Sequence, residues 1–395
     1  MISDMSHMAT EPLKIAVVFD CLFPAQTGGA ERVYGRISEL LVEKGHSVDY
    51  ITRILNVPKD THPFAVKGIW SGELYDNEGT RIPRNAFAFS WRVFWFFVKN
   101  RNKYDVVFLS STPVLNLIAG STALLGTKAL VIADWLEVWT LSQWKKYSGF
   151  TMGAIAFGLQ TFATRFGDII TVNSNFTARR LKKYRKSQRL IKLGLVDLNS
   201  HDDEDWEPHT PNKKYLLFVG RHIEDKQIKI LIRAMDQPEL IETNIDLYIV
   251  GTGPETEGLI TESKKLSHPE RVRFLGKVSD SELHKLMQSA SVNVNPSKRE
   301  GFGLVVSEAA RWGTPSVVID EPDNASKELI IPGKNGYVAQ ESRADSLASV
   351  IRKALDNEEE LRNSTRLWFI DNSKSSGLHS SVNQILDLVN ILRKP

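Results

Sequence analysis

The segment that decides the fold is NPSKREGFGLVVSEAARWGTPSVV, residues 295–318. It starts at the end of an apolar strand, passes through a loop that holds Glu300, Gly301 and Gly303, and continues as a helix that carries Glu308. The two glycines allow close approach, so backbone N–H groups at the start of the helix can point at an anion. The two glutamates can face the same ligand. The alternative is that Glu308 only complements the helix dipole, but this leaves the loop and its spacing unexplained.

Short runs rich in Val and Ile alternate with longer segments of helical period on both sides of this segment. The expected strands are Lys14–Phe19, Val48–Thr52, Asp105–Ser110, Ala129–Ala133, Asp168–Val172, Tyr215–Val219, Asp246–Val250, Val272–Leu275, Ser291–Asn295 and Ser316–Ile319. Intervening segments such as Ala30–Lys44 and Ser279–Gln288 have the pattern of amphipathic helices. Strands separated by helices indicate parallel sheets, and two such series predict an α/β protein with two Rossmann-like domains.

The two series are separated by residues 196–213, which are polar and acidic, carry two prolines and are typical of a linker. We expect an N-terminal Rossmann-like domain over residues 13–195 and a C-terminal Rossmann-like domain over residues 214–375. Residues 376–395 are expected to form a C-terminal helix that packs back on the N-terminal domain. Residues 1–12 are expected to be a disordered tail or a cloning remnant. Open parallel sheets bind ligands at the carboxyl ends of their strands, so the site is expected in the cleft between the domains.

The composition is that of a globular protein, with 42% hydrophobic and 25% charged residues among 395. A net charge of +3 is too balanced to indicate a nucleic-acid partner. The single cysteine, Cys21, excludes an intramolecular disulfide framework and a cysteine-based zinc cluster, and it fits a reducing, cytoplasmic location. Since no uncharged apolar run reaches about 20 residues, a membrane-spanning helix is not expected.

Two motifs are set aside. Gly251-Thr252-Gly253-Pro254 follows a strand, but Thr256 occupies the third glycine position of a dinucleotide fingerprint, which argues against a nicotinamide cofactor. Asp203-Glu204-Asp205 has the form of an Asp-x-Asp metal motif, but it lies in the acidic linker and is interpreted as a solvated charge run.

Two further loops could bind phosphate. Gly28-Gly29 follows the first strand and opens a helix, so it could admit an anion, or it could be an ordinary strand-to-helix turn. Arg221 and Lys226 follow the strand Tyr215–Val219. The planar fork of arginine and the point charge of lysine could hold a diphosphate without metal. The alternative is a solvated loop with two ordinary surface cations.

Together these segments resemble the retaining glycosyltransferases of family 4, which have the GT-B fold. The resemblance extends from Lys14 to about Val338 and rests on GGAERV (28–33), FVGRHIEDK (218–226), LYIVGTGPE (247–255), VRFLGKVSDSELHKLMQSASVNVNPS (272–297) and EGFGLVVSEAARWGTPSVV (300–318). It implies two Rossmann-like domains whose parallel sheets face an interdomain cleft, with the acceptor bound by the N-terminal domain (13–195) and the nucleotide sugar by the C-terminal domain (214–375). It also implies an enzyme that transfers a hexose from a nucleotide sugar, with UDP-hexose as the expected donor, to a glycan or lipid-linked acceptor.

The resemblance implies a role for each matching residue. Arg221 and Lys226 would bind the donor diphosphate and stabilise it as the leaving group. Glu300 would contact hydroxyls of the donor sugar. The donor-binding set comprises Gly28, Gly29, Gly251, Gly253, Val278, Gly301, Phe302, Gly303, Leu304 and Glu308, of which Glu308 would contact the ribose. Retention is usually described for this family as front-face attack, in which a phosphate oxygen takes the acceptor proton, so no metal or other cofactor is expected.

Two positions depart from the family pattern. Many relatives carry a histidine in the loop after the fourth N-terminal strand, where this chain has ADWLE (133–137). Asp134 and Glu137 are the nearest polar candidates on the acceptor side. Gln227 also stands where a glycine commonly follows the lysine.

The N-terminal half has features typical of proteins that rest on anionic lipid. Residues 171–200 hold eight Lys or Arg against one acid, and AFAFSWRVFWFFV (86–98) is rich in aromatic residues. Contact with the inner membrane surface is expected through Trp91, Trp95, Arg179, Arg180, Lys182 and Lys183. A core helix beside a solvated basic face is an equal alternative. Likewise, Trp135, Trp139 and Trp144 could stack on a sugar or simply pack.

A second function remains open, that of a catalytically silent glycosyltransferase-like subunit that binds a partner or a nucleotide. Degenerate relatives of this kind should have lost Glu300 or Arg221, and this chain keeps both.

Overall fold

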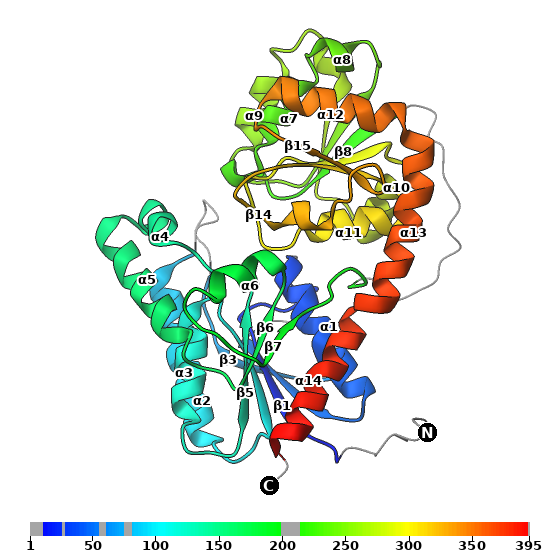
Figure 1. Ribbon diagram of the computed structural model, residues 1–395. Coiled ribbons are helices and arrows are strands. Elements are labelled where there is room, and N and C mark those ends of the chain that lie inside the picture. Colours follow the sequence, from blue (N-terminus) through cyan, green and yellow to red (C-terminus); the bar gives the residue numbers. More distant parts are fainter. Residues whose placement is uncertain (1–10, 26–27, 55–60, 75–80, 199–213, 394–395) are drawn as a thin grey trace, which may run out of the picture.

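The computed structural model describes residues 11–25, 28–54, 61–74, 81–198 and 214–393. It consists of two α/β domains, and the chain ends in a helix that returns to the first of them (Figure 1). The tail over residues 1–10, most of the linker and the Asp203-Glu204-Asp205 motif lie outside the described residues.

The N-terminal domain is built on a seven-stranded sheet in the order β3-β2-β1-β4-β5-β6-β7, and every pairing in it is parallel. Its strands are β1 (Lys14–Val18), β2 (Ser47–Arg53), β3 (Ala65–Trp70), β4 (Val106–Ser110), β5 (Leu130–Trp135), β6 (Ile169–Val172) and β7 (Leu190–Lys192). Its helices are α1 (Gly29–Glu43), α2 (Pro83–Lys99), α3 (Val114–Ala123), α4 (Leu141–Ser148), α5 (Phe150–Ala163) and α6 (Asn175–Leu181).

Helices cover both faces of this sheet because the strands are apolar on both sides. Ile15 and Val17 of β1 belong to a core shared with α1 and with α14 (Leu378–Arg393). Ala16 and Val18, which point the other way along the same strand, belong to a core shared with α2, α3 and α5. The continuous apolar run of β1 is therefore the pattern of a central parallel strand.

The C-terminal domain has a six-stranded sheet in the order β10-β9-β8-β11-β13-β15. Its strands are β8 (Tyr215–Val219), β9 (Asp246–Val250), β10 (Val272–Gly276), β11 (Val292–Asn295), β13 (Ser316–Ile319) and β15 (Gly336–Ala339). Its helices are α7 (Ile228–Ala234), α8 (Pro238–Ile241), α9 (Thr256–Ser263), α10 (Asp280–Ser289), α11 (Leu304–Arg311), α12 (Ala344–Asp356) and α13 (Glu358–Ser376). A short parallel pair, β12 (Arg299–Glu300) with β14 (Asp323–Asn324), lies outside the main sheet.

The final two helices connect the domains. Helix α13 contacts α11 of the C-terminal domain, whereas α14 contacts α1 and β7 of the N-terminal domain (Figure 1). The start of α14 is anchored by two hydrogen bonds, from Leu378 N–H to the Asp197 carboxylate at 2.8 Å and from Gly194 N–H to Ser381 Oγ at 2.8 Å.

The predicted α/β fold with two Rossmann-like parallel sheets is confirmed, and each of the ten expected strands is present. Three strands of the two main sheets were not predicted from the sequence: β3, β7 and β15, which are short or lie at the sheet edges. The fourth expected strand was placed too early: β5 runs to Trp135, so Asp134 is a strand residue rather than a loop residue. No described helix is both long and apolar enough to cross a bilayer.

Candidate functional site

The loops that carry the predicted site meet where the two domains face each other. A Cβ atom at Gly29 would lie 2.7 Å from Leu304 Cδ1, and one at Gly301 would lie 2.9 Å from Asn173 Nδ2. Both contacts cross from one domain to the other. Phe302 and Leu304 pack against the apolar core of the N-terminal domain. The glycines are therefore required for close approach, and the apolar side chains of the same loop join the domains.

Glu300 is held at this junction by donors from two neighbouring segments. Lys226, in the short 3₁₀ turn Glu224–Lys226 after β8, forms an ion pair with Glu300. Glu300 Oε1 also accepts hydrogen bonds from Ser297 Oγ at 3.1 Å and from Asn295 Nδ2 at 3.4 Å. The structure therefore brings together the predicted catalytic pair of Lys226 and Glu300, with both side chains partly exposed.

Arg221 presents a cation to the same junction. It directly follows Gly220 at the end of β8, and its side chain is exposed. Within the described part of the chain, its guanidinium has no hydrogen-bond or ion-pair partner. Burial raises the pKa of the Glu31 carboxyl on α1, and the charge of Arg221 opposes that shift. Arg221 therefore lies close enough to the N-terminal domain for its charge to act across the interface.

Gly251 and Gly253 position the loop that carries Arg221. Gly251 has φ +119°, and a Cβ atom there would lie 2.0 Å from the Gly220 carbonyl oxygen. A Cβ at Gly253 would lie 2.4 Å from the carbonyl oxygen of His222. Thr256, which breaks the dinucleotide fingerprint, accepts a hydrogen bond from Gly253 N–H at 3.0 Å. These glycines have a clear packing role, and their contact with a donor base stays a prediction.

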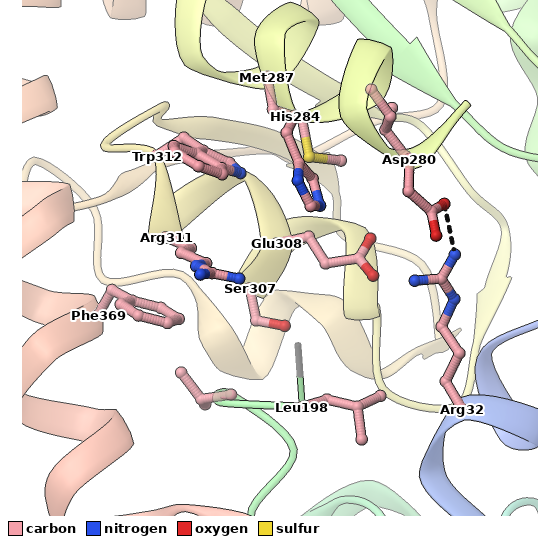
Figure 2. Close-up of a pocket in the computed structure, with 12 residues that line it drawn as sticks. Arg32, Leu198, Asp280, His284, Met287, Ser307, Glu308, Arg311, Trp312 and Phe369 are labelled. Atoms are coloured by element: carbon pink, nitrogen blue, oxygen red, sulfur yellow. Dashed lines mark hydrogen bonds and ion pairs between the residues drawn. The ribbon is translucent and has the colours of Figure 1, made fainter. Parts of the chain in front are cut away.

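Glu308 lies in a hollow of about 430 Å³ between the domains, shown in Figure 2. The side chain extends towards the ion pair that Arg32 of α1 forms with Asp280 of α10, at 2.9 Å. His284 and Trp312 line the same hollow, with ring centroids 5.4 Å apart. The lining residues do not include Arg221, Lys226 or Glu300.

The remaining donor-side residues surround this region. Gly303 adopts φ +94° as the N-cap of α11, where only the lack of a Cβ avoids contact with Ser326. Gly28 is the N-cap of α1, and a Cβ there would lie 2.3 Å from the Glu31 carboxylate. Val278 precedes α10 and packs partly buried against the core around Tyr215 and Met287. The structure does not place Val278 in the hollow that holds Glu308.

The two acceptor-side candidates have different environments. Asp134 is 0% exposed and accepts hydrogen bonds from Tyr34 Oη at 2.5 Å and Thr171 Oγ1 at 2.6 Å. Burial raises its pKa to about 6, although both hydrogen bonds favour the charged form. A carboxyl enclosed in this way cannot touch an acceptor, so the expectation for Asp134 is corrected. Its position within β5 turns it into the core.

Glu137, in contrast, lies at the interface. Its carboxylate accepts a hydrogen bond from Trp139 Nε1 at 2.5 Å, and its Cγ lies 3.6 Å from where a Cβ at Gly301 would be. Asn173, at the carboxyl end of β6, faces the same glycine and was missed by the sequence analysis. The general rule that ligands bind at the carboxyl ends of parallel strands could have found it.

A set of polar contacts joins the domains around this site. Arg180 pairs with Asp323, and Arg179 pairs with Glu328 at 2.7 Å. Arg299 stacks on the Trp139 ring at 4.2 Å. Both Arg179 and Arg180 pair with acids of the C-terminal domain, the former with its side chain still exposed, and their contact with a membrane stays a prediction.

The remaining tryptophans and lysines singled out in the sequence lie in different environments. Trp135 is buried, whereas Trp139 and Trp144 lie partly exposed with ring centroids 4.8 Å apart. Lys182 and Lys183 are exposed. Among the described residues, no group of three or more His, Cys, Asp and Glu side chains could hold a metal ion.

Comparison with known proteins gives a separate model match for each domain. A model of the group 1 glycosyl transferases matches residues 201–367, and a model of Glycosyltransferase Family 4 matches residues 27–193. A sucrose-phosphate synthase from Thermosynechococcus elongatus superposes with a TM-score of 0.77 over 96% of this chain and 99% of that one, at 21% identity. The chain has the GT-B fold. The two family models confirm the expectation that the protein is a glycosyltransferase.

One further solved structure and one curated relative are similar to this chain. Anabaena HepE, in a structure with UDP-glucose, has a TM-score of 0.69 over 96% of this chain and 100% of that one, at 16% identity. An uncharacterized glycosyltransferase of Methanocaldococcus jannaschii is 37% identical over 37% of each chain. In this relative and three further curated ones, the alignment spans between 34% and 52% of their length.

Proposed function

We propose that the protein is a retaining, metal-independent glycosyltransferase of family 4. It transfers a hexose from a UDP-sugar to a glycan or lipid-linked acceptor, in the cytoplasm at the inner membrane surface. The observation that carries this proposal is the junction described above. There Arg221, which has no side-chain partner among the described residues, and Lys226 follow the end of β8, and Lys226 pairs with Glu300, which directly precedes the glycine loop that opens α11.

The charges at this junction suit a departing nucleoside diphosphate. Cleavage of the bond between the sugar C1 and the phosphate oxygen places negative charge on the diphosphate, and cations already in position stabilise that charge. The exposed guanidinium of Arg221 offers a planar fork of donors for this purpose. Lys226 is paired with Glu300 in the free protein, and it could exchange that contact for phosphate when the donor binds. The backbone N–H groups at the start of α11 add further donors.

Two contributions would then come from the carboxylates. Glu300 is held by Ser297 and Asn295 even without Lys226, so it can accept hydrogen bonds from sugar hydroxyls once the lysine turns to phosphate. Glu308 lines the hollow beside α11, and in the proposed complex its carboxylate would contact the ribose hydroxyls. The UDP-glucose complex of HepE, a protein of the same fold, supports uridine as the base.

Without a covalent glycosyl-enzyme intermediate, retention requires the acceptor to attack from the face that the diphosphate leaves. In the proposed reaction the acceptor oxygen forms a bond to C1 as the bond from C1 to the diphosphate breaks. The acceptor proton passes to a phosphate oxygen of the leaving group, so atoms and charge balance without a metal. Glu137 and Asn173 lie across from Gly301 and are the side chains placed to orient that acceptor.

Thermal unfolding with a panel of UDP-, GDP- and ADP-sugars in excess EDTA tests this proposal. A donor at 100 times its dissociation constant adds about 2.7 kcal/mol if it binds only the folded state. We expect UDP-sugars alone to raise the melting temperature, and Arg221→Ala to abolish the rise. A shift with GDP-sugars would reassign the base. No shift with any nucleotide sugar, or a shift that needs Mg²⁺, would contradict the proposed site.

A further inference from the structure

The N-terminal domain carries an exposed apolar surface on the side of the sheet opposite α1 and α14. Figure 1 shows α2, α3 and α5 side by side along this flank, with α4 continuing from α5. Its exposed members on α2 and α5, which we call the α2–α5 face, are Phe87, Trp91, Trp95, Phe150, Met152, Ile155 and Phe162. Of the fifteen large hydrophobic side chains exposed among the described residues, ten lie between Phe87 and Phe162.

The exposure follows regular stripes rather than scattered positions. On α2, Phe87, Trp91 and Trp95 are 60%, 52% and 44% exposed and recur every fourth residue, while Phe89 and Val93 of the same helix are buried. The rings of Phe87 and Trp91 lie 6.4 Å apart at 16°. The helix thus has one apolar side in the core and a second one facing outward. A helix that is apolar on both sides is typical of one covered by another partner.

Helix α5 also exposes large apolar side chains, although without the four-residue period of α2. Phe150 is 75% exposed and Ile155 is 52% exposed, and α5 contains no charged residue at all. An uncharged helix with an apolar outer side is costly to leave in water, because apolar area costs about 25 cal/mol per Å² when exposed. The amide of Arg81, just before α2, donates to Tyr147 Oη at the end of α4 at 3.4 Å, so the two stripes are linked at that end.

The helices that form this face carry cations and no acids. Helices α2, α3, α4 and α5 carry five cations (Arg84, Arg92, Lys99, Lys145 and Lys146) and no Asp or Glu. Across residues 81–167 there are ten Lys or Arg and only three acids. These acids face elsewhere, since Asp105 pairs with Arg393, Asp134 is buried and Glu137 lies at the domain interface.

We propose that the α2–α5 face is a docking surface for an anionic lipid bilayer. Aromatic side chains suit the interface between headgroups and acyl chains, and surrounding cations are attracted to anionic headgroups. A second copy of the chain fits less well, because a two-fold symmetric pairing would bring the cations of one face against those of the other. The inference rests on the membrane location in the proposed function and deepens it by naming the surface that binds, and lipid binding can be measured without donor or acceptor, separately from sugar transfer.

This surface also differs from the one expected from sequence. Arg179 and Arg180 are engaged between the domains, whereas Trp91 and Trp95 remain exposed on α2. Helix α4 links the face to the cleft, because Gln143 Nε2 donates to Asp323 of the C-terminal domain at 2.6 Å. A headgroup held by the bilayer would therefore meet the protein beside the interdomain junction.

Cosedimentation of the full chain with vesicles tests the proposal. We expect the protein to bind vesicles of phosphatidylcholine with phosphatidylglycerol more tightly than vesicles of phosphatidylcholine alone, and salt to weaken the binding. The double variant Trp91→Ser with Ile155→Ser should lower the partition coefficient at least tenfold. Arg84→Glu and Lys146→Glu should lower it only for anionic vesicles, by more than the about fivefold expected for loss of one cation.

Matched controls separate this face from general surface apolarity. Leu367 on α13 and Ile391 on α14 are 61% and 62% exposed, so Leu367→Ser and Ile391→Ser remove similar apolar area elsewhere and should leave vesicle binding unchanged. Circular dichroism establishes that each variant is folded. Absence of binding to anionic vesicles at low salt would overturn the proposal. So would a dimer in sedimentation velocity that Trp91→Ser dissociates while vesicle binding is unaffected.

Discussion

Asp134 offers a test that separates a structural carboxyl from a catalytic one. Its carboxyl is fully buried on β5, and burial raises its pKa from 3.8 to about 6. The folded state therefore binds a proton more tightly than the unfolded state does. Because the pKa is higher in the folded state, the contribution of this carboxyl to the free energy of unfolding falls as the pH rises, and the loss is complete above about pH 6.

The magnitude follows from the two pKa values. The shift from 3.8 to about 6 corresponds to about 3 kcal/mol in total, at 1.36 kcal/mol per pKa unit. Part of this change in the free energy of unfolding takes place below pH 5, where the carboxyl of the unfolded chain already begins to protonate. Between pH 5 and pH 8 the remaining change is about 1.4 kcal/mol. The variant Asp134→Asn keeps the shape of the side chain and lacks this titration.

Urea unfolding at pH 5, 6, 7 and 8 measures the effect. We expect the free energy of unfolding of the natural protein, minus that of Asp134→Asn, to fall by about 1.4 kcal/mol from pH 5 to pH 8. Other titrating groups cancel in the difference. Thr171→Val removes one hydrogen bond that favours the carboxylate, so it should destabilise the protein more at pH 8 than at pH 5. A difference that stays flat across this range, or a folded Asp134→Asn without any transfer activity, would refute a structural role.

Three further predictions concern the site. Glu300→Ala should lower transfer about a hundredfold or more with the melting temperature retained, because it removes the acceptor of three hydrogen bonds at the junction; normal turnover would contradict its role. Gly301→Ala places a Cβ 2.9 Å from Asn173 and should lower kcat/KM by about a hundredfold, whereas Gly258→Ala, which meets nothing within 4 Å, should not. Gln227→Gly should raise the free energy of unfolding by about 1 kcal/mol because Gln227 has φ +48°, and Gln237→Gly, at φ −81°, should not.

Local sequence patterns predicted most of the strands and helices. Residues 15–18 of β1 (IAVV) are apolar at every position and all buried, because a central parallel strand is covered on both faces. The capping box of Ser279 with Glu282 marks the start of α10 in the sequence and is present in the structure. The edge strand β3 was missed because half-exposed edges lack the continuous apolar run.

The sequence also predicted part of the site, because the positions of residues after strand ends can be recognised in the sequence. Lys226 and Glu300 follow strand ends, and parallel topology brings strand ends to one edge, so their proximity could be expected. Asp134 shows where this reasoning failed. The strand β5 extends two residues beyond the expected end, and in a strand the direction of a side chain alternates, so a small error in the boundary changes what the residue faces.

The sequence by itself determined the two parallel α/β domains, the glycine loops and the residues that carry charge, because hydrophobic period and strand-end position are local properties of the chain. Only the tertiary structure decided which charges are used between the domains and which face outward. Nothing in the sequence separates Arg180 from Arg84, since both are arginines of predicted helices. In the structure Arg180 pairs with Asp323, whereas Arg84 is exposed on α2 beside an apolar stripe. The partner of a charge depends on segments far away in the chain, and folding alone brings those segments together.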